Sequence, residues 1–107
     1  MKPSDFKDDP AAKKLWVDQV VGLADEYRKS NQSLEAGRLF ALAGKESEDW
    51  EGRAAALYKG GLLLLASGRK TEATDALKLA SEDTNNLYYS NLAKERLNQI
   101  STTGGNQ

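Results

Sequence analysis

The chain of 107 residues contains no cysteine and no histidine. The lack of cysteine excludes disulfides, thiol chemistry and Cys-ligated zinc or iron–sulfur sites. The lack of histidine removes the commonest general base and the commonest metal ligand. Most familiar catalytic and metal-binding arrangements are therefore unavailable, and we predict a non-catalytic protein without a metal or a cofactor.

Charge of one sign and long apolar runs are also missing. With 15 basic and 16 acidic residues the formal net charge is -1, which gives no general attraction to nucleic acid or to anionic membranes. The longest apolar runs, 54–58 and 62–66, fall far short of the ~20 residues that span a bilayer. The chain starts on a polar and acidic stretch, which is unlike a secretory signal. We therefore expect a cytoplasmic protein without nucleic-acid binding or membrane insertion.

Proline occurs only as Pro3 and Pro10, and the chain is rich in Ala, Leu, Glu, Lys and Arg, a composition typical of helices. Asp9 followed by Pro10 marks a helix start, because Asp caps free N–H groups and proline suits the first helical position. Ser33 is predicted as a second N-cap, and Gly68 as the left-handed residue that closes a helix. We predict an all-α protein with about five helices, at about 10–28, 33–46, 50–66, 71–81 and 87–100.

One helical domain is expected at 10–100, with hairpins at about 10–46 and 50–82 and a last helix at about 87–100. A flexible N-terminal arm is expected at 1–9. The stretch 101–107 contains Gly104-Gly105 and no large apolar residue, so it is predicted to be a disordered tail.

On the first helix, the apolar residues form one stripe made of Leu15, Trp16, Val20, Leu23, Ala24 and Tyr27.

Small and bulky residues recur with the same spacing in the two hairpins. The successive steps are 3, 9, 4 and 3 residues in both sets, and each residue lies 37 positions before its counterpart. Antiparallel helices approach closely only where small side chains meet, so the small residues are predicted to mark helix crossings and the bulky ones to fill the space beside them. The two sets are Ala24, Tyr27, Ala36, Phe40, Ala43 and Gly61, Leu64, Ala73, Leu77, Ala80.

These residues resemble the tetratricopeptide repeat over about 17–100. The first hairpin departs from the family at Asn31, which replaces the turn glycine, although Asn also tolerates a left-handed backbone. The period of 37 exceeds the family's ~34, with extra residues near 47–49. The resemblance implies antiparallel hairpins stacked as a short solenoid with 87–100 as its capping helix. It rests on Leu57–Leu64, Gly68, Glu72-Ala73, Leu77, Ala80 and Asn85-Asn86, and on Leu23-Ala24, Tyr27, Glu35-Ala36, Phe40 and Ala43.

Proteins of this family bind peptides in a concave groove lined by the first helix of each hairpin. Carried over by position, the resemblance implies an apolar groove around Tyr58, Leu62 and Leu65, since the run 62–65 is apolar on all sides of its helix. This predicts an adaptor or scaffold that binds a partner helix or peptide. The groove residues would be Val21, Asp25 and Arg28, then Tyr58, Lys59, Leu62 and Leu65, and finally Tyr89 and Arg96.

Other interpretations of the same surface stay open. The fifth helix or the N-terminal arm would cover it, or two copies of the chain would bury it around a two-fold axis. A carboxylate-based enzyme is the least favoured, because adjacent acidic residues such as Asp25 and Glu26 point apart on a helix. The family's clamp for acidic peptide C-termini is not expected, since it needs Lys and Asn where Val21 and Asp25 stand.

Overall fold

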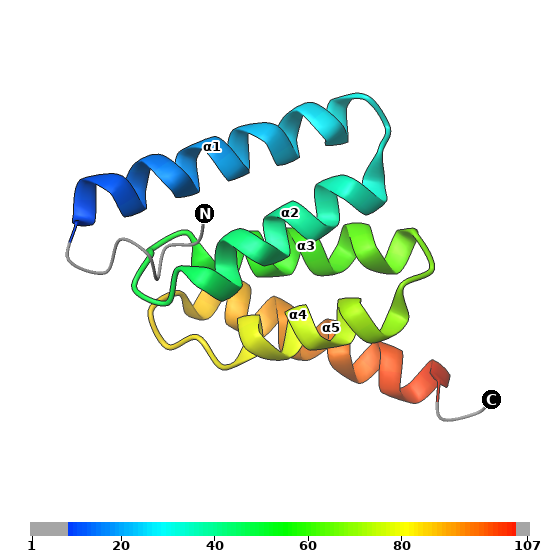
Figure 1. Ribbon diagram of the computed structural model, residues 1–107. Helices are drawn as coiled ribbons and strands as arrows, with labels where there is room; N and C mark the ends of the chain where they lie inside the picture. The colour runs from blue at the N-terminus through cyan, green and yellow to red at the C-terminus, as the bar shows by residue number, and fades with distance from the viewer. Residues whose placement is uncertain (1–8, 105–107) are drawn as a thin grey trace.

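The computed structural model describes residues 9–104, with side chains through Ser101, and this part of the chain holds five helices and no strand (Figure 1). The predicted all-α class is confirmed. Apart from Asp9, the expected N-terminal arm lies outside the described residues. The helices are α1 (Pro10–Lys29), α2 (Ser33–Glu46), α3 (Arg53–Ala66), α4 (Lys70–Ser81) and α5 (Leu87–Gly104).

The helix boundaries confirm some of the predicted caps and correct others. Asp9 caps α1, where its Oδ1 accepts a hydrogen bond of 3.0 Å from the backbone N–H of Ala12. The prediction for Ser33 is wrong: it is the first residue of α2, and Gln32 occupies the cap without a side-chain bond. Helix α5 continues to Gly104, so residues 101–104 of the predicted tail are helical, while 105–107 lie outside the described part.

The two hairpins share one turn geometry. Asn31 and Gly68, which are 37 residues apart, both have a left-handed backbone, with φ of 62° and 78°. Each is followed by a residue whose N–H returns to a carbonyl five positions earlier, which closes the helix. These bonds run from Gln32 N to Tyr27 O and from Arg69 N to Leu64 O, both at 2.9 Å. The sequence repeat is therefore matched by a repeated local structure.

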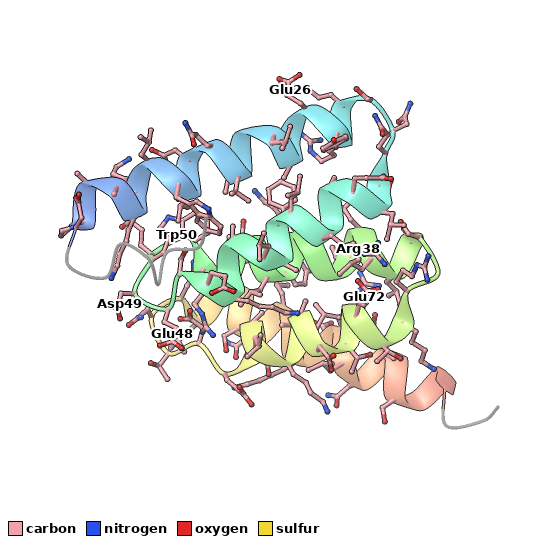
Figure 2. All side chains as sticks on the ribbon, viewed as in Figure 1. Glu26, Arg38, Glu48, Asp49, Trp50 and Glu72 are labelled. Carbon is pink, nitrogen blue, oxygen red and sulfur yellow. The ribbon has the colours of Figure 1, made fainter. Side chains whose placement is uncertain are left out.

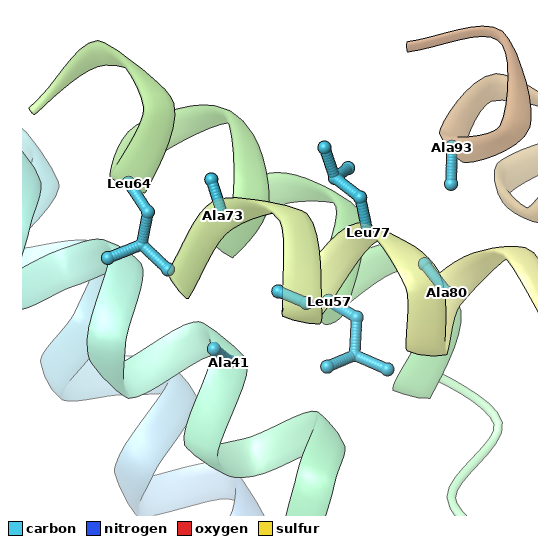
Figure 3. Packing of buried hydrophobic residues seen from close by; sticks show 8 residues of the cluster. Ala41, Leu57, Leu64, Ala73, Leu77, Ala80 and Ala93 are labelled. Carbon is cyan, nitrogen blue, oxygen red and sulfur yellow. The ribbon is translucent and has the colours of Figure 1, made fainter. Parts of the chain in front are cut away.

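Two clusters of buried side chains hold the helices together. The predicted crossing residues Ala24, Ala36 and Ala73 are fully buried, as are Ala43 and Ala80. The larger cluster contains side chains from α2, α3, α4 and α5 (Figure 3). The smaller one contains side chains from α1, α2 and α3. The larger cluster consists of Ala41, Leu57, Leu64, Ala73, Ala76, Leu77, Ala80 and Ala93, and the smaller one of Ala24, Phe40 and Ala56.

Helices α2 and α3 come close to each other where Gly37 and Gly60 meet. A Cβ added to Gly60 would lie 2.8 Å from the carbonyl oxygen of Gly37 and 2.9 Å from the backbone nitrogen of Ala41. Both distances are too short for real Cβ contacts, so only glycine allows the backbones to come this near. The contact joins the two hairpins, because α2 ends the first hairpin and α3 begins the second.

A polar group links three helix ends. Arg53, at the start of α3, donates through Nε to the carbonyl oxygen of Gly44 in α2 at 3.1 Å. Its Nη1 lies 3.8 Å from Oδ2 of Asp83, a carboxylate that is only 6% exposed. The Oδ1 atom of Asp83 accepts hydrogen bonds from the backbone N–H groups of Asn85 (2.7 Å) and Asn86 (3.2 Å). The α4–α5 loop is thus fastened to the junction of the two hairpins.

Candidate functional site

The four consecutive leucines of α3 point in different directions, as expected for a helix. Leu64 is buried in the larger cluster, and Leu63 packs against the smaller one. Leu65 is half-buried against the larger cluster. Leu62 is also only half-buried, and it belongs to neither cluster. Of the predicted apolar floor, Leu62 is therefore the leucine that is least used by the protein's own core.

Helix α5 covers part of the predicted groove. The ring of Tyr58 on α3 lies 5.8 Å from the ring of Tyr89 on α5, with a 48° angle between their planes. Tyr58 also packs against the larger cluster. Tyr89 meets its neighbour Tyr88 edge to face at 5.0 Å. The structure therefore brings two predicted groove residues together, and it uses their rings in packing between α3 and α5.

The predicted groove residues of α1 do not join this group. Val21 packs against the smaller cluster, with Ala24 and Phe40. Arg28 donates through Nε and Nη2 to Oδ1 of Asp25, at 3.1 and 3.0 Å, in an ion pair on the surface of the same helix. Such a pair satisfies both charges locally and contributes little to stability.

The predicted groove surface on α3 and α5 contains both apolar and charged side chains. Leu62 and Arg96 are half-buried, and Lys59 is exposed. Tyr89, a predicted groove residue, is half-buried, whereas its neighbour Tyr88, which the prediction did not include, is 68% exposed. Of the three residues of α3 predicted to form the apolar surface, Leu62 is thus the one that packs against neither cluster, so the apolar surface is smaller than predicted.

A small cleft lies between α2 and α4, and Leu64 of α3 also lines it. Across it, Arg38 donates through Nε and Nη2 to the two carboxylate oxygens of Glu72 at 3.0 and 2.9 Å (Figure 2). This hydrogen bonding lowers the pKa of Glu72 and raises that of Arg38. With a volume of about 140 Å³, the cleft is smaller than typical ligand pockets. A carboxyl held ionised in this way is the opposite of a general acid, which needs a raised pKa.

Large apolar side chains are exposed elsewhere, and sequence reasoning missed this. Leu15 and Leu23 of α1 are 59% and 49% exposed, although both belong to the apolar stripe. Leu87, at the start of α5, is 61% exposed. The 37-residue period could have predicted the exposure on α1. Helix α2 covers the corresponding flank of α3, and none of the described helices covers that flank of α1.

Within the described residues, neither a metal site nor a membrane-spanning helix is found. Residues 9–104 contain no group of three or more acidic side chains that could hold a metal ion. Within the same range, none of the helices combines the length and apolar content needed to cross a bilayer. Comparisons with protein-family models, with curated proteins and with solved structures give no match. The resemblance to tetratricopeptide repeats therefore depends on the residues and on the repeated turn alone.

Proposed function

We propose that this chain is a non-catalytic adaptor that binds a helix or an extended segment of another protein across α1, α3 and α5. A short solenoid of tetratricopeptide type is part of this proposal, and so is a location in the cytoplasm. The proposal is supported mainly by Leu62, a large apolar side chain of α3 that is only half-buried and packs against neither buried cluster. An accessible leucine at such a place suits contact with a partner.

The chemistry around Leu62 describes the expected partner. Lys59 lies three residues before Leu62 on the same face of α3, and Tyr58 lies four residues before it. On α1, the Asp25–Arg28 pair offers one charge of each sign. A partner segment with one apolar anchor and flanking charges would fit such a surface. The binding energy would be concentrated on the anchor, because exposed ion pairs add little.

The helices give this surface a rigid frame. The larger cluster fixes α3 against α4 and α5, and the Tyr58–Tyr89 contact limits movement between α3 and α5. Because few groups of the adaptor need to be ordered on binding, little conformational entropy opposes association.

The experiment compares Leu62→Asp with Leu87→Asp, a matched change at an exposed leucine outside the proposed surface. Each chain is used to capture proteins from its native source, and binding is repeated with the captured protein after purification. We expect Leu62→Asp to abolish binding and Leu87→Asp to retain it, with unchanged circular dichroism in both. Binding that survives in a folded Leu62→Asp variant, or no binding by the unaltered chain, would contradict the proposal.

Self-association remains the second candidate function. In the sequence interpretation it uses the same patch on α3, and the mass of the isolated chain in solution distinguishes it from binding of another protein. A specific observation favours it: the most exposed apolar side chains of the two hairpins lie on α1, at Leu15 and Leu23.

A further inference from the structure

Helix α1 lies at one end of the row of helices, with α5 at the other (Figure 1). It packs mainly against α2, and only Val17 and Ala24 of its residues are buried. Trp16, Val20 and Tyr27 are half-buried, and Leu23 is about half exposed. One flank of α1 therefore carries an apolar row that the described part of the chain does not cover completely.

The internal repeat shows what normally lies against such a row. On α3, four residues with steps of 4, 3 and 4 face α2. Cβ atoms added to Gly37 and Gly44 of α2 would contact Leu64 and Leu57, and Arg53 bonds to the Gly44 carbonyl. These four residues of α3 are Arg53, Leu57, Gly60 and Leu64, and 37 positions earlier stand Trp16, Val20, Leu23 and Tyr27 of α1.

The apolar row of α1, which we call the α1 seam (Trp16, Val20, Leu23 and Tyr27), thus matches a row that is covered by a helix in the second hairpin. Within residues 9–104 no helix takes that place on α1. The covered row has Gly60 at the closest point, whereas the seam has Leu23. A helix lying on the seam must therefore sit further away and meet it with large side chains instead of a bare backbone.

We propose that the occupant is a second copy of this chain, docked through its own α1 seam in an antiparallel pair. Apolar residues at alternating steps of 4 and 3 are the pattern by which two helices pack against each other. Among the described helices, α2 is unsuitable because it is occupied on both sides: Phe40 packs with Ala24 of α1, and Gly37 lies against α3. The α1 seam is apolar along its whole length, and the described residues cover it only in part.

The seam is complementary to itself when two copies run antiparallel. With the two-fold axis between residues 21 and 22, Trp16 of one copy faces Tyr27 of the partner subunit, and Val20 faces Leu23 of the partner subunit. Every seam residue then has an apolar counterpart, and large rings meet at both ends of the pair. Antiparallel helices also place opposite ends of their dipoles side by side.

The inferred dimer is small and reversible. About three helical turns of seam on each side bury less than the ~800 Å² per partner of standard stable interfaces. We therefore expect half-association between about 10 and 100 µM, which corresponds to weak but specific binding.

Sedimentation equilibrium of the full chain from about 1 µM to about 1 mM tests the inference. The unaltered chain is expected to change from monomer to dimer, and Leu23→Glu to dimerise at least about tenfold more weakly, so that it stays mostly monomeric at the concentration where the unaltered chain is half dimeric. Leu87→Glu is the matched control, since Leu87 is even more exposed. It and Leu62→Asp should dimerise normally. Leu23→Lys repeats the test with the opposite charge.

The inference is refuted if the unaltered chain is a monomer at about 1 mM, or if folded Leu23 variants dimerise as strongly as the unaltered chain. Dimerisation lost in Leu62→Asp and kept in Leu23→Glu would assign the contact to the α3 patch and refute the seam. A second measurement leaves the seam unchanged and follows the fluorescence of Trp16. It uses the Trp50→Phe variant, in which Trp16 is the remaining tryptophan. Its emission should shift to shorter wavelength as the dimer forms, and an unchanged emission during dimerisation would refute the inference.

Discussion

Replacing Gly60 by alanine tests how closely the two hairpins approach. The added methyl group would lie 2.8 Å from the Gly37 carbonyl oxygen, 2.9 Å from the Ala41 nitrogen and 3.2 Å from the Phe40 Cβ. Two of these three atoms belong to the backbone of α2, so no side-chain rotation relieves the overlap. Helices α2 and α3 must separate by several tenths of an ångström, which also loosens the neighbouring side chains.

Two opposing terms set the magnitude. Overpacking of a well-filled core costs about 1–3 kcal/mol, and the upper half of that range applies here because the obstacle is backbone. Alanine in place of glycine inside a helix returns about 1 kcal/mol through its helix propensity. We expect the Gly60→Ala variant to be less stable by about 1–2 kcal/mol, and each kcal/mol corresponds to a melting temperature lowered by about 4–8 °C.

The matched control is Gly22→Ala. Gly22 also lies inside the first helix of a hairpin, but nothing stands within 4 Å of an added Cβ. Only the propensity term applies there, so this variant should gain about 0.5–1 kcal/mol. Urea unfolding followed by circular dichroism measures both changes. Equal stability gains at the two positions would refute the close contact between α2 and α3.

Two further predictions concern charged groups. Asp83→Ala should lower the free energy of unfolding by about 1–3 kcal/mol in urea titrations, because two backbone N–H groups and Arg53 lose their acceptor. Asp83→Asn keeps an oxygen atom that can accept these bonds, so it should lower the free energy of unfolding by less. Equal losses in the two variants would contradict the role given to the Oδ1 atom. The hydrogen bonds from Arg38 hold the pKa of Glu72 below its ordinary value of 4.5, so the pair stabilises the fold above that pH and the contribution is lost as the pH falls below it. Thermal melts from about pH 5 to about pH 3 should therefore show a smaller decrease for Glu72→Gln than for the unaltered chain.

Local signals in the sequence were sufficient to predict the helices and their repeat. Proline is confined to the N-terminal tenth of the chain, and the left-handed residues Asn31 and Gly68 end the first helix of each hairpin, as their backbone preferences suggest. The spacing of small residues also located Ala36 and Ala73 at buried crossings. These features are encoded within a few residues of each other.

Features that depend on contacts between distant residues were missed. The row Gly37, Ala41 and Gly44 faces α3, yet its spacing alone does not say which neighbour it meets. The Arg53–Asp83 contact spans thirty residues, and no local pattern in the sequence indicates it. Helix α5 ends at Gly104 and not at about residue 100, although the glycine-containing stretch after residue 100 was predicted to be disordered.

The candidate groove was only partly predictable for a similar reason. Position within a repeat indicates the face of a helix, and it does not reveal how much of that face the following helix covers. Tyr58 and Leu65 are packed with the larger cluster and Tyr58 touches Tyr89, so most of the apolar surface expected on α3 is used inside the molecule. Leu62 stayed half-exposed, and its role in binding remains a prediction.

The tight glycine contact between α2 and α3 has a consequence for how the molecule comes apart. In many repeat proteins the units are the cooperative elements and their junctions are weaker. Here a tight backbone contact crosses the junction, and Arg53 connects that junction to the loop before α5. Neither hairpin keeps its buried surface without the other, so the chain should melt in a single transition, and fragments divided between α2 and α3 should gain structure only when they are mixed.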